Sequence, residues 1–129
     1  MGAQAILLVE DEILIRILVA DLLRDAGYEV AEAASGEDGL RLLESGGDFD
    51  LLMTDIKMPG ALDGLALATH WKNLFPGRPV LVSSGHLTAD RMHPADELIV
   101  KPYSDARLLA TVERLIGPPC QPRAPRLTA

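Results

Sequence analysis

The stretch LLMTDIKMPG, residues 51–60, decides the fold class. Its apolar run, Leu51 to Met53, is followed by a Met-Pro-Gly breaker, and such a bounded run is typical of a buried β-strand. Asp55 therefore lies where this strand leaves the sheet. An acid there is either an ordinary turn residue ahead of Pro-Gly or a chemical group, and the ends of the other strands decide between the two.

Four more apolar runs have the character of strands, at residues 5–9, 28–33, 79–83 and 97–100. Helical spacing lies between or after them, at residues 12–26, in a segment that begins at Ser35, at residues 64–72 and from Ser104 to Ile116. In the first of these segments Leu14, Leu18 and Leu22 recur every four residues, which predicts that they form the apolar face of the helix.

Strands that alternate with helices predict a doubly wound α/β domain with a five-stranded parallel sheet. Between Ser84 and Glu97 the apolar periodicity is weak and a proline interrupts it, so the fourth helix is expected to be short or irregular. We expect one domain over residues 1–117 and a disordered, Pro-rich tail over residues 118–129, which contains the only cysteine, Cys120.

The composition is that of a globular protein, with 48% hydrophobic and 24% charged residues. The net charge of -7 argues against sequence-independent binding to nucleic acid, because that needs Lys and Arg to neutralise phosphates. No apolar run approaches the roughly 20 residues that cross a bilayer, and the first residues lack the features of a signal peptide. We therefore expect a cytoplasmic protein with no membrane or nucleic-acid partner.

Charged and polar side chains follow four of the five apolar runs, namely Glu10 and Asp11 after the first, Asp55 after the third, Ser84 after the fourth and Lys101 after the fifth. Because the carboxyl ends of parallel strands meet at one edge of the sheet, we expect these side chains to lie close together. Ser83 is an alternative to Ser84, but its spacing from the preceding apolar residues favours Ser84.

Carboxylates so close together need a cation, because two of them repel by about 4 kcal/mol at 4 Å with an effective dielectric constant near 20. Mg²⁺ suits the site best, since it prefers oxygen ligands in octahedral geometry. Glu10 and Asp11 are placed to share the ion, and Asp55 is the candidate nucleophile for an acyl phosphate. Lys101 would stabilise charge on the phosphoryl oxygens, and Ser84 would move to meet them.

Four motifs, in this order and at these separations, resemble the receiver domain of two-component response regulators: LLVEDE (7–12), MTDIKMPG (53–60), VLVSSG (80–85) and LIVKPY (98–103). The resemblance covers nearly all of residues 4–117. It implies a flavodoxin-like fold with the sheet in the order 2-1-3-4-5 and a phosphoryl group carried by Asp55. It implies that the backbone carbonyl of Lys57 completes the metal site and that Ser84 and Lys101 have the family's signalling roles.

The resemblance also implies a phosphoryl donor, which is a histidine kinase or a histidine phosphotransfer protein. We expect a monomer or weak dimer that signals through contacts with a downstream protein. It would be a phosphoacceptor with at most slow self-dephosphorylation and not an enzyme.

Three features depart from the pattern of that family. The loop that leads to Asp63 has one residue more than usual, and Leu98 stands where the family commonly has an aromatic that swings inward. The segment between Ser84 and Lys101 is shorter than usual. Tyr103 is an alternative source of an aromatic for the surface of the fourth helix, fifth strand and last helix.

Two other functions remain open at this point. A phosphatase of the haloacid dehalogenase type also uses a strand-end aspartate with Mg²⁺, but it resembles DxD there, and this chain has Lys57 at the second position. The other is a receiver-like module that binds partners without phosphorylation. The three histidines are scattered, and we interpret them as surface side chains and not as ligands: His70, His86 and His93.

Overall fold

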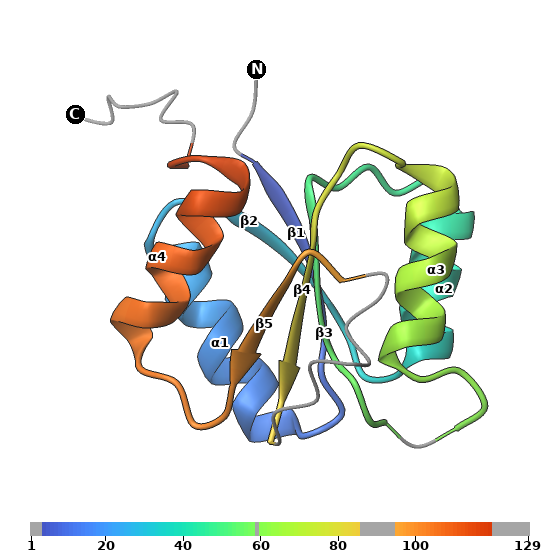
Figure 1. The fold of residues 1–129 in the computed structure, drawn as a ribbon, viewed down its shortest axis with the longest axis horizontal. Helices are drawn as coiled ribbons and strands as arrows, with labels where there is room; N and C mark the ends of the chain where they lie inside the picture. Colours follow the sequence, from blue (N-terminus) through green and yellow to red (C-terminus); the bar gives the residue numbers. More distant parts are fainter. Residues whose placement is uncertain (1–3, 59, 86–94, 120–129) are drawn as a thin grey trace.

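Five strands lie parallel in one sheet, in the order β2-β1-β3-β4-β5 (Figure 1). The strands are β1 (Ala5–Val9), β2 (Glu29–Ala33), β3 (Leu51–Asp55), β4 (Val80–Ser84) and β5 (Glu97–Val100). The computed structural model describes residues 4–58, 60–85 and 95–119 of the chain. This sheet order and the parallel pairing confirm the predicted doubly wound, flavodoxin-like fold.

Four helices lie within the described ranges, α1 (Ile13–Asp25), α2 (Gly36–Glu44), α3 (Gly64–Leu74) and α4 (Asp105–Ile116). The side chains of Ser35, Asp63 and Ser104 accept a backbone N–H of the first turn of α2, α3 and α4, respectively, which is the usual way to satisfy such donors. The predicted short fourth helix falls on residues 86–94, and Cys120 with most of the predicted tail falls on 120–129. Both segments lie outside the described residues.

The sheet separates two hydrophobic cores, as expected when helices cover both faces of a parallel sheet. Helices α1 and α4 cover one face, and α2 and α3 cover the other (Figure 1). Alternation along β1 sends Ile6 and Leu8 into the first core and Leu7 and Val9 into the second. Strands β1, β3 and β4 are therefore apolar on both faces, and polar groups begin where these strands end.

The predicted apolar face of α1 is wrong for Leu14 and Leu18, whereas Leu22 packs against the core between α1, α4 and the sheet. Leu14 and Leu18 are 72% and 69% exposed, and the residues of α1 that are buried against the sheet are Val19, Ala20 and Leu23. The helix is apolar on several sides, so periodicity alone does not fix its rotation. Arg16 helps to fix it, because its guanidinium donates to the Glu10 carbonyl at 2.9 Å and lies 3.4 Å from Glu32.

The edge of the sheet where the strands begin and the edge where they end carry different side chains. At the edge where β1 begins, the Gln4 side-chain amide donates to the Ile116 carbonyl at the end of α4, and the Tyr28 hydroxyl donates to the Gly117 carbonyl at 2.8 Å. The opposite edge, where the strands end, holds the acids. Within the described parts of the chain, no helix is long and apolar enough to span a membrane.

Candidate functional site

Asp55 is the last residue of β3, in the middle of the sheet, and is only 7% exposed. Its surroundings are tight, because α3 starts against the backbone that follows it. The amide of Gly64 donates to the Ile56 carbonyl at 2.9 Å, and a Cβ at Gly64 would lie 1.7 Å from the Asp55 carbonyl oxygen. Only glycine fits there, so the start of α3 helps to fix the backbone that carries the acid.

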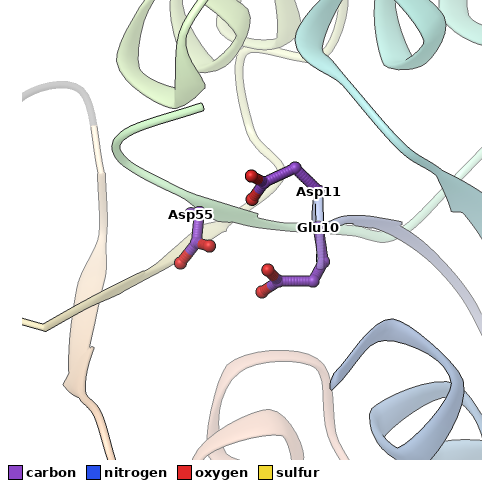
Figure 2. Close-up of side chains that lie close together, drawn as sticks. All are labelled: Glu10, Asp11 and Asp55. Atoms are coloured by element: carbon purple, nitrogen blue, oxygen red, sulfur yellow. The ribbon is translucent and has the colours of Figure 1, made fainter. Parts of the chain in front are cut away.

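Three carboxylates converge at this edge. Glu10 and Asp11 directly follow β1, Asp55 ends the neighbouring β3, and one oxygen from each lies within 4.8 Å of the others. Figure 2 shows the three carboxylates turned toward a common space. Glu10 is buried at 4% exposure and Asp11 is exposed, so the cluster reaches from the protein interior to solvent.

Lys101, which directly follows β5, supplies the positive charge. Its Nζ lies 2.8 Å and 2.9 Å from the two oxygens of Asp55 and 3.4 Å from Glu10 Oε1. Burial works to lower the pKa of Lys101, but the hydrogen bond and charge of Asp55, with the charge of Glu10, outweigh it and raise that pKa. Lys101 is therefore held as a cation.

One lysine does not balance three acids, and Glu10 reveals the imbalance. Burial, together with the negative charge of Asp55, raises the pKa of Glu10 to about 7, although the Glu12 backbone N–H, 3.1 Å from Oε2, works to lower it. Burial and a neighbouring negative charge disfavour the charged form of Glu10, and a bound cation would stabilise that form. The raised pKa is therefore typical of a cation site.

The donor set fits Mg²⁺. It offers carboxylate oxygens, which are hard ligands, and part of it faces a pocket of about 590 Å³ with room for water or a phosphate oxygen. Lys57 also lines this pocket, and its side chain is exposed. Glu10, Asp11 and Asp55 would hold the ion.

Both serines of β4 line the pocket that contains Asp55. Ser83, which sequence spacing disfavoured, pairs with Asp55 in the sheet register, and its hydroxyl donates to Asp55 Oδ1 at 2.8 Å. Ser84, the predicted signalling hydroxyl, lines the same pocket. The register of β3 and β4 would have identified Ser83. Ser83 points to the same face of the sheet as Leu81, and Asp55 points to the same face as Met53, and both of these faces line the same core.

The longer loop after β3 is held by a residue that the sequence analysis missed. Glu37, in the first turn of α2, accepts the backbone N–H groups of Ala61 and Leu62 at 2.9 and 3.2 Å. Gly60, with φ of 102°, brings the loop to that carboxylate. The sequence signal was weak, because an acid in a first helical turn is common for capping reasons alone.

Leu98 and Tyr103 lie on opposite sides of the sheet. Leu98 packs against the α2/α3 core, and Tyr103 packs against the α1/α4 core, where burial raises its pKa to about 12. Tyr103 also lines a pocket of about 280 Å³ with Leu18 and Lys101. In the described residues, then, the aromatic faces α1 and not the side of Leu98.

Comparisons with known proteins agree with this geometry. A family model described as "Response regulator receiver domain" matches residues 6–113. The chain is 34% identical over 121 residues to the sensor kinase CckA of Brucella abortus. This match covers 89% of this chain and 13% of that protein. It is 34% identical over 117 residues to the transcriptional regulatory protein PdtaR of Mycobacterium tuberculosis, covering 87% and 56%. The chain thus spans less than two thirds of either relative.

Solved structures of the same fold match over most of the chain. The chemotaxis protein CheY4 of Vibrio cholerae has a TM-score of 0.80 at 29% identity, covering 88% of this chain and 99% of that chain. A receiver protein of Sinorhizobium medicae has a TM-score of 0.82 at 31% identity, covering 88% and 94%. TrrA of Thermotoga maritima, solved in complex with Mg(2+)-BeF, has a TM-score of 0.79 at 31% identity, covering 87% and 98%.

Proposed function

The chain belongs to the response regulator receiver domain family, and from this we propose that it is a phospho-accepting switch in which Asp55 takes a phosphoryl group from a histidine. The contacts of Asp55 carry the proposal. It is a buried carboxylate at a strand end, within 4.8 Å of two further acids and in direct contact with a lysine. A solvated turn residue would have none of these neighbours.

The transfer step follows from that setting. A carboxylate oxygen of Asp55 forms a bond to phosphorus while the bond from phosphorus to the donor histidine nitrogen breaks, and the imidazole keeps the electron pair. Lys101, already held as a cation beside Asp55, would neutralise charge on the phosphoryl oxygens. Ser84 lines the pocket that would receive those oxygens and is the proposed signalling hydroxyl.

Magnesium would be held by Glu10, Asp11, Asp55 and the Lys57 carbonyl. When bound, Mg²⁺ supplies charge neutralisation at a phosphoryl oxygen and orients the phosphoryl group. The structure solved for TrrA is a complex with Mg(2+)-BeF, which supports the same ion here. The raised pKa of Glu10 supports it independently, because it is a property of this chain's own residues.

The surface beside the acceptor suits a protein donor. Of the large exposed apolar side chains in the described residues, all but Leu74 are on α1: Ile13, Leu14, Ile17 and Leu18. We refer to these four residues as the α1 patch. Leu18 also lines the pocket of about 280 Å³ beside Tyr103, and Lys101 lines both that pocket and the pocket that contains Asp55, so the patch lies next to the acceptor site. We propose that a histidine kinase or histidine phosphotransfer protein docks here, since an apolar patch of this kind marks an interaction site.

The phosphorylated state would reset by hydrolysis and signal by contact with another protein. A phosphatase of the haloacid dehalogenase type would need a second acid near Asp55 to protonate a leaving group. Lys57 occupies that sequence position, and its exposed side chain offers no acid there.

Intact mass measured after incubation with Mg²⁺ and phosphoramidate tests the proposal. The chain should gain one phosphoryl group, and Asp55→Asn should gain none. Sustained turnover of a small phosphate ester would favour the phosphatase. A chain that folds, binds Mg²⁺ and still gains no phosphoryl group would leave only the phosphorylation-independent binding module.

A further inference from the structure

One serine of β4 touches the acceptor carboxylate directly. Ser83 is 2% exposed, lies opposite Asp55 in the register of β3 and β4, and donates a 2.8 Å hydrogen bond to Asp55 Oδ1. Its neighbour on the same face of the strand is the fully buried Leu81. A polar side chain in this place is costly unless it has a partner, and the partner it has is the proposed nucleophile.

The hydrogen bond from Ser83 makes the two oxygens of Asp55 unequal. Lys101 Nζ donates to Oδ2 at 2.9 Å and lies 2.8 Å from Oδ1, so its charge is almost equally close to both oxygens. Ser83 adds a donor to Oδ1. Lone pairs that accept hydrogen bonds are less nucleophilic, which leaves Oδ2 as the better attacking atom.

We propose that Ser83 is a positioning residue that directs phosphoryl transfer to Oδ2 and keeps its hydrogen bond to Oδ1 in the acyl phosphate. This inference rests on the proposed function of Asp55. In hydrolysis, the oxygen of a water molecule bonds to phosphorus, the bond from phosphorus to Oδ2 breaks, and the electron pair returns to the carboxylate. The water proton leaves with inorganic phosphate. The returning charge is shared with Oδ1, where Ser83 donates, so the hydroxyl lowers the barrier to this step.

The lifetime of the acyl phosphate tests the inference. Wild type, Ser83→Ala and Ser83→Thr are phosphorylated with phosphoramidate and Mg²⁺, the donor is removed, and intact mass is followed with time. Loss of one hydrogen bond to a developing charge should lengthen the half-life of Ser83→Ala by about three- to tenfold. Ser83→Thr, which keeps the hydroxyl, should restore the wild-type decay.

Thr54→Val is the matched control. It also removes a buried hydroxyl, but that hydroxyl donates to the backbone carbonyl of Asp55 at 3.0 Å and not to the carboxylate. Its decay should stay within about twofold of wild type, since the barrier change would be below about 0.4 kcal/mol. If Ser83→Ala does not fold, Ser83→Cys takes its place, because a thiol is a weak donor of similar shape.

Two results separate this inference from the proposed function. Wild type that gains no phosphoryl group overturns both. Wild type that is phosphorylated, with Ser83→Ala or Ser83→Cys decaying at the same rate, overturns the role of Ser83 alone. An equal slowing in Thr54→Val would also overturn it, because the effect would then come from the loss of any buried hydroxyl near Asp55.

Discussion

Glu10 carries a charge that its surroundings in the fold disfavour. Its pKa is raised to about 7 by burial and by the charge of Asp55, whereas the ordinary value is 4.5. Between these two pH values the native state binds more protons at this position than the unfolded chain does. The contribution of Glu10 to the free energy of unfolding is therefore fully present at low pH and falls as the pH rises through this window.

Without Mg²⁺, the free energy of unfolding from urea titrations should fall between pH 5 and pH 8, and the part due to Glu10 is at most about 3 kcal/mol. Glu10→Gln, which remains neutral, should show a smaller fall. Added Mg²⁺ should reduce the fall in the wild-type protein, because the ion favours the charged form of Glu10. Equal pH dependence in the two proteins would contradict the assignment to Glu10.

The loop that follows β3 shows how one side chain can hold an element. Glu37 accepts two backbone N–H groups from the segment that carries the extra residue, and Gly60 comes close to the same carboxylate. This contact joins the start of α2 to the chain between Asp55 and α3. The loop beside the acceptor is therefore tied down, although its length departs from the family pattern.

Glu37→Ala should lower the free energy of unfolding by about 1 to 2 kcal/mol, because two backbone donors lose a charged acceptor. Affinity for Mg²⁺ should also fall, since the loop includes Lys57, the proposed carbonyl ligand. Glu44→Ala removes the same charge from an exposed position at the end of α2, and it should change stability by less than about 0.5 kcal/mol. Urea titration and Mg²⁺ calorimetry on both variants measure these effects.

Helix α1 is the element whose surface departs most from the sequence expectation. Its outward residues are as apolar as its inward ones, so periodicity placed Leu14 and Leu18 in the core, whereas the fold leaves both in solvent. Sequence alone does not reveal which apolar side of a helix meets the sheet when the chain provides two. The exposed side is then available for a partner.

Changing Leu14 and Leu18 to Ser should alter stability by less than about 0.5 kcal/mol each, because neither side chain is buried. Phosphorylation by phosphoramidate should be unchanged. Transfer from a histidine-phosphorylated protein donor should slow by about tenfold or more, the effect of removing central apolar contacts from an interface. Leu74→Ser, another exposed leucine but on α3, is the control, and equal slowing in that variant would contradict docking at the α1 patch.

For the whole molecule, Mg²⁺ binding and folding are linked, because the three acids come together only in the folded chain. An ion present at ten times its dissociation constant should add about 1.4 kcal/mol to the free energy of unfolding by mass action. Asp11→Asn should lose most of that gain, whereas it should change little without Mg²⁺, because Asp11 is exposed. Urea titrations with and without the ion make the comparison, and an equal gain in both proteins would place the ion elsewhere.

Most of the fold was predictable because the spacing of apolar residues and the turn residues that end each apolar run are local properties of the sequence. Apolar runs located all five strands. Four of these runs lead into acids, serine or lysine, and parallel topology then placed Glu10, Asp11, Asp55 and Lys101 at one edge. The contact between Ser83 and Asp55 was missed because it depends on the register of two strands. The rotation of α1 and the Glu37 contact depend on tertiary packing, which sequence period does not encode.

The contacts of Gln4 with Ile116 and of Tyr28 with Gly117 place the first and last described segments of the chain side by side, on the edge remote from Asp55. A group attached through either segment therefore starts on the side of the sheet opposite Asp55. A fluorescent reporter, a surface tether or a neighbouring module joined there would not shield the aspartate. The same proximity favours circular permutation, with new termini in the exposed turn around Gly77 and the old ones bridged by a short linker.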